Sequence, residues 1–386
     1  MPSCANSWLS RIREAINPCG PEKTVDLYGK RVLIVKLRYI GDTLSMVPVA
    51  ANLKRLSPGT IVEVLVNLGT ETVVKHHPCI DRTWTYDYAL SKKSGYKSII
   101  YQLNLIKKLR SRRYDVVIDY THGDRAALIC FLTGAPIRIT HRHADRLSQW
   151  LMNRFVNSDP AANHIVDHQL ASLKVLGLDG FERKLELHVP DSVRRSVDRR
   201  IESAGLSSER AWVVLHPGAR GGLRRWRSER FGEVARRLQT ATSSSVLLLG
   251  GPGEEPLLED VKAHMERPPD LCSADMSLLE TGELLRRSTL FIGNDSAPAH
   301  LAAAAGCPTL TLFGPTFPHM WRPLSPLGEV VFRELPCCGC RQEACIRPED
   351  SCMDLIEVDE VWDRAVRLLE RIRVPDTKGP VRPRFS

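Results

Sequence analysis

Residues 291–306 read FIGNDSAPAHLAAAAG, and the fold of the chain can be worked out from this stretch. A short apolar run is followed by polar residues and then by an alanine-rich run. This order predicts a strand at 290–292 and a helix at 300–305 that begins near Pro298. The apolar run at 309–313 predicts another strand. A strand, a helix and a second strand in succession indicate a parallel sheet.

The same alternation of strand and helix occurs in both halves of the chain. In the second half we predict strands at 212–215 and 246–249 and helices at 228–238 and 358–372. In the first half we predict strands at 31–36, 61–66 and 115–119 and helices at 43–56, 99–112 and from about Arg125. Continuous apolar strands are typical of parallel sheets covered on both faces. The fold class is therefore α/β, with two Rossmann-like, doubly wound domains.

Length and composition agree with two soluble domains. The chain has 386 residues, of which 43% are hydrophobic and 26% charged, and its formal net charge is +9. A basic balance favours an anionic partner, such as a phosphate-bearing ligand, an anionic membrane surface or nucleic acid. The predicted parts are an N-terminal helical extension (1–29), a first domain (30–188), a linker helix (189–206), a second domain (207–373) and a disordered basic tail (374–386).

We expect a cytoplasmic location. No apolar run reaches the roughly 18 residues of a membrane span, and the first residues lack the apolar core of a signal peptide.

The polar turn GNDSAPAH at 293–300 has the character of an anion site. Main-chain N–H groups at a helix start, together with the Ser296 hydroxyl, suit a phosphate group. Asp295 would repel phosphate, so it fits only if it meets sugar hydroxyls or accepts hydrogen bonds from the turn. His300 is compatible with two roles, that of a donor to a phosphate and that of a satisfied buried histidine.

A glycine- and arginine-rich loop, HPGARGGLRRW at 216–226, follows the strand at 212–215. Glycine lets the main chain approach a phosphate, and Arg220, Arg224 or Arg225 would neutralise it. The alternatives are a solvated basic loop and an RNA-contacting patch. Since aromatic residues make up only 6% of the chain, a small phosphate ligand is the favoured interpretation.

Two other motifs are weaker. In GGPGEE at 250–255, Glu254 or Glu255 could bind ribose or sugar hydroxyls, although an ordinary surface turn explains the motif equally well. A cluster of cysteines near the C-terminus is compatible with a zinc site or with a thiol-rich loop that binds no metal. The candidate zinc ligands are Cys338, Cys340, Cys345 and Cys352.

In the first half, the sequence KLRYIGDT at 36–43 follows the first strand. Ligands of open α/β sheets bind beyond the carboxyl ends of the strands. Asp42 is therefore compatible with a general base for an acceptor hydroxyl, and equally with a helix N-cap.

Together these motifs resemble glycosyltransferase family 9, the ADP-heptose:lipopolysaccharide heptosyltransferases. The resemblance rests on four stretches and covers about residues 31–372. They are RVLIVKLRYIGD (31–42), VVLHPGARGGLRRW (213–226), DSAPAHLAAAAG (295–306) and LFGPTFP (312–318).

The resemblance implies a GT-B fold, in which two Rossmann-like domains face each other across a cleft. It also implies an inverting glycosyltransferase without cofactor or catalytic metal. Asp42 would be the base and Arg224 would neutralise the leaving diphosphate. The donor-binding residues would be His216, Gly218, Arg224, Glu254, Asp295, Ser296, Ala297 and His300. The candidates for binding a phosphorylated acceptor are Arg38, Arg125, Arg138, His141, Arg142 and His143.

The resemblance further implies the partners. The donor would be a nucleotide-diphosphate sugar, with ADP-heptose favoured. The acceptor would be a lipid-linked phosphorylated glycan such as the lipopolysaccharide inner core, reached by peripheral contact with the cytoplasmic face of the inner membrane. No nucleic acid would be bound. The alternatives are a sugar-nucleotide epimerase or hydrolase, which would consume donor without acceptor, and a basic nucleic-acid-binding protein.

Overall fold

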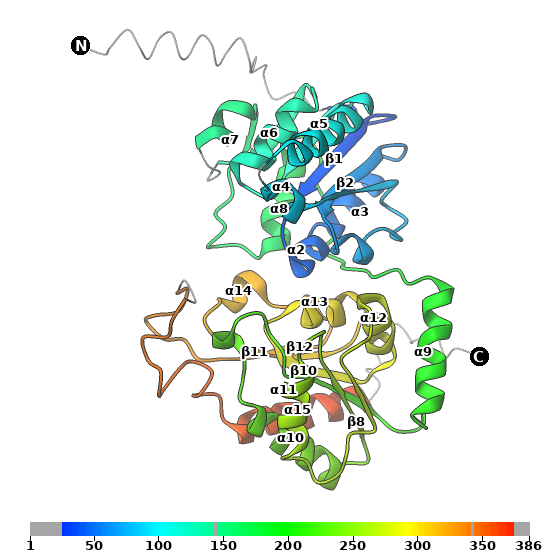
Figure 1. Ribbon diagram of the computed structural model, residues 1–386, viewed down its shortest axis with the longest axis vertical. Helices are drawn as coiled ribbons and strands as arrows, with labels where there is room; N and C mark the ends of the chain where they lie inside the picture. The colour runs from blue at the N-terminus through cyan, green and yellow to red at the C-terminus, as the bar shows by residue number, and fades with distance from the viewer. Residues whose placement is uncertain (1–24, 94, 143–145, 341–342, 374–386) are drawn as a thin grey trace. The chain divides into compact units, whose positions relative to one another are not determined.

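The computed structural model describes residues 25–93, 95–142, 146–340 and 343–373. These residues form two compact units. The first contains the chain up to Pro190 together with His319–Trp321, and the second contains the remainder. Each unit is built around one six-stranded sheet (Figure 1). The predicted N-terminal helix and the basic tail lie outside the described residues, apart from the last residues before position 30.

The sheet of the first unit has the strand order β3-β2-β1-β4-β5-β6, and all its strand pairs are parallel. Its strands are β1 (Arg31–Lys36), β2 (Ile61–Asn67), β3 (Arg82–Tyr86), β4 (Val116–Asp119), β5 (Ile137–His141) and β6 (Arg154–Val156). The central strands β1 and β4 are almost entirely buried, because helices cover both faces of the sheet.

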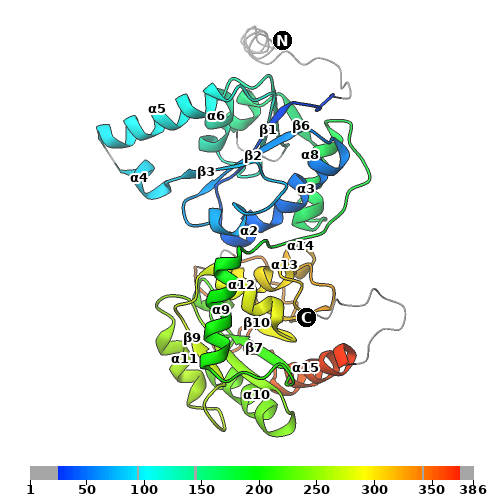
Figure 2. The ribbon, with the colours of Figure 1, turned by 90° about the vertical axis from the view of Figure 1, so that its right-hand side faces the viewer.

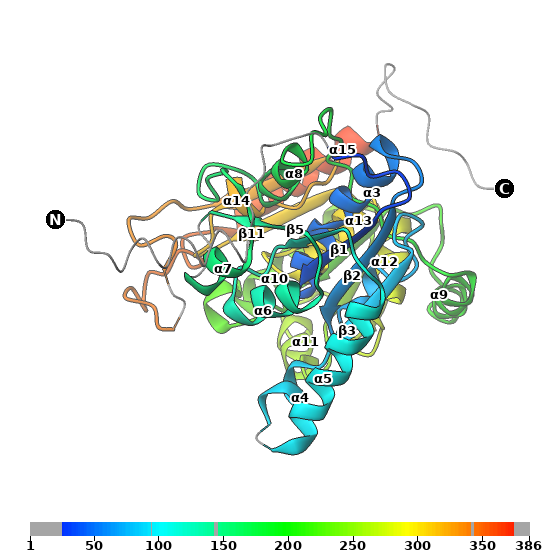
Figure 3. The same cartoon turned by 90° about the horizontal axis from the view of Figure 1, so that it is seen from above.

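The helices of the first unit are α2 (Ile40–Ser45), α3 (Val47–Leu56), η1 (Glu71–Val73), α4 (Tyr88–Lys92), α5 (Tyr96–Ser111), α6 (Asp124–Leu132), α7 (Arg146–Leu151) and α8 (Ile165–Lys174). Helices α3 and α8 pack together on one face of the sheet, and α5 and α6 pack on the other (Figure 2 and Figure 3). The single helix predicted at 43–56 is in fact two helices that meet at Met46. Pro48 explains the break, since it lacks an N–H and is tolerated only in a first helical turn.

The sheet of the second unit has the order β12-β11-β10-β7-β8-β9 and is also fully parallel. Its strands are β7 (Trp212–His216), β8 (Ser245–Leu249), β9 (Leu271–Ser273), β10 (Leu290–Asn294), β11 (Thr309–Phe313) and β12 (Gly328–Phe332). The remaining helices are α9 (Asp191–Ser203), η2 (Gly222–Arg224), α10 (Ser228–Ala241), α11 (Glu255–Lys262), α12 (Leu278–Arg287), α13 (Ala297–Ala304), α14 (Pro318–Trp321) and α15 (Val358–Arg373).

Helices α10, α11 and α15 cover one face of this second sheet, α12 and α13 cover the other, and α9 packs against α12 (Figure 2). Numbered from its own first strand, each sheet has the order 3-2-1-4-5-6, which is the Rossmann order. The predicted class, α/β with two Rossmann-like doubly wound sheets, is thus confirmed. No helix in the described part of the chain combines the length and the apolar character needed to cross a membrane.

Candidate active site

In both units, several candidate residues follow the carboxyl ends of central strands, among them Asp42 in the first unit and Arg224 and Asp295 in the second. Strands β1 and β4 are neighbours in the first unit, as are β7 and β10 in the second. In a sheet of order 3-2-1-4-5-6, the connections from strands 1 and 4 leave toward opposite faces. The crevice opened at this switch point is where Rossmann-like sheets bind their ligands.

In the first unit, the carboxylate of Asp42 is held by a buried lysine. Asp42 lies in the first turn of α2, whose N-cap is Tyr39, so the capping alternative for Asp42 is wrong. Its Oδ1 lies 3.1 Å from Nζ of Lys36, and the Asp42 side chain is 18% exposed. Lys36 also donates to the main-chain oxygen of Tyr120 at 3.1 Å. The carboxylate is therefore fixed in position while it stays accessible to a ligand.

Burial controls the charges around this pair. It lowers the pKa of Lys36, and the neighbouring Asp42 carboxylate opposes that change by favouring the charged amine. Burial also raises the pKa of Asp119, at the end of β4, to about 6. Asp119 Oδ1 accepts the N–H of Thr121 at 2.8 Å, whereas its buried Oδ2 has no hydrogen-bond partner.

Cations gather around Tyr88 in the first unit. Lys92 Nζ lies 4.7 Å from the centre of the Tyr88 ring, and the Arg125 guanidinium carbon lies 5.2 Å from it. A hydrogen bond with Lys92, with further contributions from the charges of Lys92, Arg125 and Arg38, lowers the pKa of Tyr88. Arg38 is exposed and donates to the main-chain oxygen of Thr121 at 2.8 Å. This cationic cluster suits a phosphate-bearing ligand.

The other acceptor candidates differ in exposure. Arg142 is exposed, and its guanidinium carbon lies 5.9 Å from the centre of the Phe155 ring. Arg138 is only 7% exposed, and it donates to the main-chain oxygens of Leu151 and Ala135 at 2.8 and 2.7 Å.

These contacts of Arg138 hold the chain around β5, so its guanidinium has a structural role and is not on the ligand-facing surface. His141 is also buried, and it contacts other histidines. His143 lies outside the described residues.

In the second unit, Asn294 ties two loops together. Its Nδ2 donates to the main-chain oxygen of Pro217 at 2.7 Å, and its Oδ1 accepts the N–H of Trp226 at 3.1 Å. Trp226 is itself buried and donates to the main-chain oxygen of Ile356 at 2.9 Å. The last residue of β10 thereby positions both ends of the arginine-rich loop that follows β7.

The next residue, Asp295, accepts a hydrogen bond from Thr316 and forms an ion pair with Arg224. It is 4% exposed. Thr316 Oγ1 donates to its carboxylate, and Arg224 Nη1 lies 3.4 Å from its Oδ2. Asp295 thus accepts a hydrogen bond, but its donor lies in the 312–318 stretch and not, as expected, in the turn at 293–300. Arg224 is 30% exposed in its side chain, so its guanidinium is accessible to a ligand.

The start of α13 offers a hydroxyl and main-chain N–H groups. Ser296 is the N-cap, but its side chain makes no capping hydrogen bond, and its Oγ is buried with no hydrogen-bond partner. Ala297 and Pro298 form the first turn, so the helix begins one residue earlier than expected. His300 lies half-buried on the next turn. A buried hydroxyl without a partner beside a helix N-terminus is well suited to an anionic ligand.

Glu254 is distinguished from Glu255 by its contacts. Its Oε2 accepts the N–H of Gly251 at 2.8 Å, and its Oε1 lies 3.7 Å from Arg225 Nη2. A Cβ on Gly218 would come within 2.1 Å of Glu254 Oε2, so a larger residue there would displace this carboxylate. His216 is buried 3.9 Å from the same carboxylate, and burial lowers its pKa. Glu254 therefore belongs to the loop cluster that follows β7.

The zinc site at the cysteines stays a prediction. Among the described residues, two groups have potential ligand atoms within 4.8 Å of one another, and neither contains a cysteine. Burial and neighbouring thiols raise the pKa of Cys352 to about 11. The cysteines Cys338, Cys340, Cys345 and Cys352 line a pocket of the second unit.

Sequence reasoning missed the partners of the predicted residues. Lys36 stood in the quoted motif at the end of the first strand, and Thr316 stood in the LFGPTFP stretch, so both had a signal in the sequence. Asn294 likewise lay next to Asp295. Lys92 had no signal beyond its charge, because its position over Tyr88 depends on how α4 is placed.

The model of glycosyltransferase family 9 (heptosyltransferase) matches residues 102–349, more than half of the chain. The chain belongs to glycosyltransferase family 9. Lipopolysaccharide heptosyltransferase 3 of Escherichia coli (strain K12) is 30% identical to it over 293 residues, which cover 74% of this chain and 83% of that protein. Lipopolysaccharide core heptosyltransferase OpsX of Haemophilus influenzae is 24% identical over 306 residues, which cover 78% and 84%.

A solved structure has the same fold. The glycosyl transferase family 9 structure from Veillonella parvula superposes with a TM-score of 0.81 and 22% identity, covering 90% of this chain and all of that one. The family 9 protein described here thus has the GT-B fold class predicted from its sequence. It is a glycosyltransferase by family.

Proposed function

We propose that this family 9 glycosyltransferase transfers a heptose from ADP-heptose to the inner core of lipopolysaccharide, with inversion at the anomeric carbon. One observation carries most of the proposal. In both units, the motifs of the family lie at the switch point of a Rossmann sheet, where such sheets bind ligands. The names of the matched relatives, which are lipopolysaccharide heptosyltransferases, support the choice of sugar and acceptor.

The second unit is the proposed donor side. We assign the diphosphate to the Ser296 hydroxyl, the N–H groups at the start of α13 and the Arg224 guanidinium. Asp295 and Thr316 hold Arg224 in place for this role. Fixed cationic and N–H donors stabilise the charge that develops on the departing ADP without having to reorganise during the reaction.

Around this diphosphate site, Glu254 is assigned to the nucleotide ribose. His216 and Gly218 shape its loop. Ala297 and His300 complete the turn at the start of α13, and His300 is assigned to the diphosphate side of the donor.

The first unit is the proposed acceptor side. Asp42 accepts the proton of the attacking hydroxyl, and Lys36 keeps the carboxylate oriented. Arg38 and Arg125, together with Lys92, contact phosphate groups of the acceptor, and Arg142 adds another exposed cation. The buried Arg138 and His141 are not part of this surface.

The proposed chemistry is a single displacement. The hydroxyl oxygen attacks the anomeric carbon as the bond to the diphosphate oxygen breaks, so the configuration inverts. The hydroxyl proton goes to Asp42 and the charge of the leaving group to Arg224. Neither role requires a metal ion, so we propose a metal-independent transfer step. The acceptor is lipid-linked, so we also propose that the enzyme works at the cytoplasmic face of the inner membrane.

The experiment is acceptor-dependent release of ADP from ADP-heptose, with the anomeric configuration of the product read by NMR. The proposal predicts that ADP appears only when the lipopolysaccharide acceptor is present and that the configuration inverts. Equal consumption of donor without acceptor would instead identify a hydrolase or epimerase. A parallel thermal-shift series with other nucleotide sugars tests the donor, because ADP-heptose should stabilise the folded state most.

A further inference from the structure

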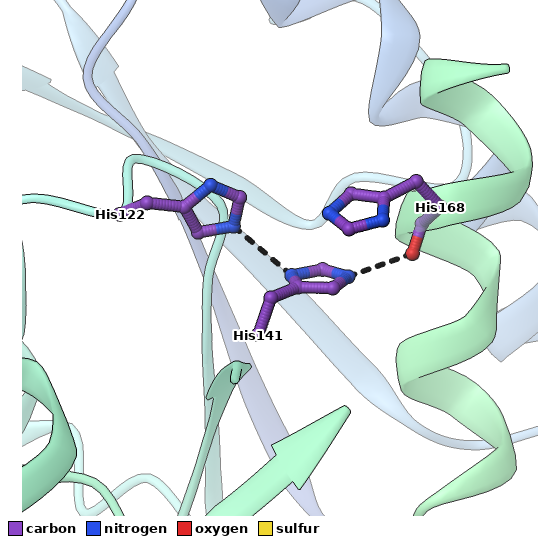
Figure 4. A group of neighbouring side chains, drawn as sticks. All are labelled: His122, His141 and His168. Carbon is purple, nitrogen blue, oxygen red and sulfur yellow. Dashed lines mark hydrogen bonds between the residues drawn. The ribbon is translucent and has the colours of Figure 1, made fainter. Parts of the chain in front are cut away.

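Three histidine side chains meet at one edge of the first unit's sheet. His122 follows β4, His141 ends β5 and His168 lies on α8 (Figure 4). One ring nitrogen from each lies within 4.8 Å of the other two. Nε2 of His122 is 3.0 Å from Nδ1 of His141, and the rings of His141 and His168 are stacked with centroids 3.7 Å apart. The glycosyl transfer proposed above uses none of these side chains.

In His141 and His168, the second ring nitrogen has a hydrogen-bond partner, as is typical of histidines that bind a metal. Nε2 of His141 lies 2.7 Å from the main-chain oxygen of His168, a group that can only accept, so Nε2 carries the proton and Nδ1 faces the cluster. Nδ1 of His168 lies 3.0 Å from the hydroxyl of Ser158. Histidine ligands almost always bond their second ring nitrogen to a carbonyl, carboxylate or water in this way, which fixes the tautomer.

Burial and backbone conformation also favour a ligand set. His141 and His168 are buried and His122 is half-buried, and burial disfavours the charged form of an imidazole. Neutral imidazole is the form that coordinates metals. His122 also has a φ of 62°, a left-handed conformation that is uncommon for histidine and is often found at functional sites.

A second group, formed by His77, Glu186 and His188, is less suited to a metal. Nδ1 of His77 accepts the N–H of Cys79 at 3.2 Å, so in the neutral ring the proton is on Nε2. With its Nδ1 occupied in this way and its Nε2 protonated, the neutral ring has no free lone pair for a metal.

We propose that His122, His141 and His168 bind one late first-row divalent cation, with Zn²⁺ expected, and that a water molecule takes the fourth position. Three neutral imidazoles suit this class of ion. Tetrahedral zinc with Zn–N distances of about 2.0–2.1 Å separates ligand nitrogens by about 3.3 Å, close to the 3.0 Å between His122 and His141. The ring of His168, now stacked on that of His141, would have to turn and approach to complete the ligand set.

Bound there, the ion joins β4, β5 and α8. It stabilises the edge of the sheet that carries Asp119 and Thr121. The ion stabilises the fold and takes no part in the transfer step. The proposed metal site therefore does not depend on the proposed glycosyl transfer.

The test uses the full chain, stripped with a chelator and titrated with Zn²⁺ and then with Co²⁺. We expect one saturating equivalent in isothermal calorimetry and, at about 100 times the dissociation constant, a rise in melting temperature of about 5–10 °C. The Co²⁺ complex should show visible d–d bands without the near-ultraviolet thiolate band that a cysteine site gives. Zinc X-ray absorption on the wild type should show nitrogen ligands near 2.0 Å and no sulfur near 2.3 Å.

Variants locate the ion. His122→Asn tolerates the left-handed backbone and removes the imidazole, and His168→Gln removes a second ligand; each should weaken binding at least about 10- to 100-fold. His77→Asn and the exposed His264→Gln are matched controls and should bind as the wild type does. No saturable binding, a thiolate band, a sulfur shell, or loss of binding in His77→Asn but not in His122→Asn would each overturn the proposal. The wild-type spectra decide the ligand type even if a variant fails to fold.

Discussion

Replacing Ser296 with alanine should separate donor binding from folding at the start of α13. A serine N-cap normally accepts a helix N–H, and its loss costs about 0.5–2 kcal/mol. Ser296 makes no such bond, and its Oγ has no hydrogen-bond partner within the described residues. We therefore expect the free energy of unfolding of Ser296→Ala to stay within about 0.5 kcal/mol of the wild type.

Donor binding should respond much more strongly. A hydrogen bond to a charged group contributes about 1.5–3 kcal/mol, and every 1.4 kcal/mol changes a dissociation constant about tenfold. If Ser296 donates to the diphosphate, ADP should bind Ser296→Ala about 10- to 100-fold more weakly. Isothermal calorimetry with ADP measures this change, and denaturant unfolding of the same preparations measures stability.

Ser288→Ala is the matched control. The Ser288 hydroxyl is buried and donates to the main-chain oxygen of Leu284 at 2.8 Å, so its loss should cost about 1 kcal/mol of stability and leave ADP binding unchanged. The reasoning is refuted if Ser296→Ala binds ADP as tightly as the wild type. It is also refuted if that variant loses stability as an ordinary N-cap does.

Three other predictions test separate parts of the account. Gly218→Ala places a methyl group 2.1 Å from the present position of Glu254 Oε2. By displacing that carboxylate, it should raise KM for the donor about tenfold. An unchanged KM would contradict the assignment of Glu254 to the ribose. Arg224→Met should lower kcat about 10- to 100-fold. The control Arg227→Met loses only an exposed ion pair and should keep wild-type turnover. Equal turnover in both variants would exclude Arg224 from leaving-group stabilisation. Burial lowers the pKa of His77 to about 4, so between pH about 6.5 and 4 the unfolded chain binds this proton more readily and the wild type loses stability as the pH falls. When the pH is lowered from 7 to 4.5 in urea unfolding, the free energy of unfolding should therefore fall less in His77→Asn than in the wild type, by at most about 2–3 kcal/mol. Equal losses in the two proteins would contradict the burial argument.

Most inner strands were predictable from sequence, whereas the inner strand β5 and the edge strands were not. The predicted strand at 31–36 coincides with β1, because its residues 32–35 are continuously apolar, as is typical of a strand buried on both faces. Strands β3 and β12 lie at sheet edges, are partly exposed and carry polar residues, so no such run marks them. Their strand conformation depends on pairing with a neighbour that is distant in sequence.

The position of the candidate site followed from topology, since parallel strands bring their carboxyl ends to one edge. The side-chain contacts within the site could not be predicted from topology. Thr316 bonds Asp295 only because β10 and β11 are neighbours. Arg138 was expected at the ligand surface because it is charged, but it lies on a strand whose side chains are buried. The sequence does not reveal that main-chain oxygens satisfy its guanidinium.

The most direct test of the central claim is the turnover of Asp42→Asn at saturating ADP-heptose and lipopolysaccharide acceptor, with ADP release as the readout. The account predicts that kcat falls about 10²- to 10⁴-fold, as expected for loss of a general base, while the dissociation constant for ADP, which binds the second unit, stays at the wild-type value. Wild-type turnover by this variant would contradict the assignment of Asp42 as the base.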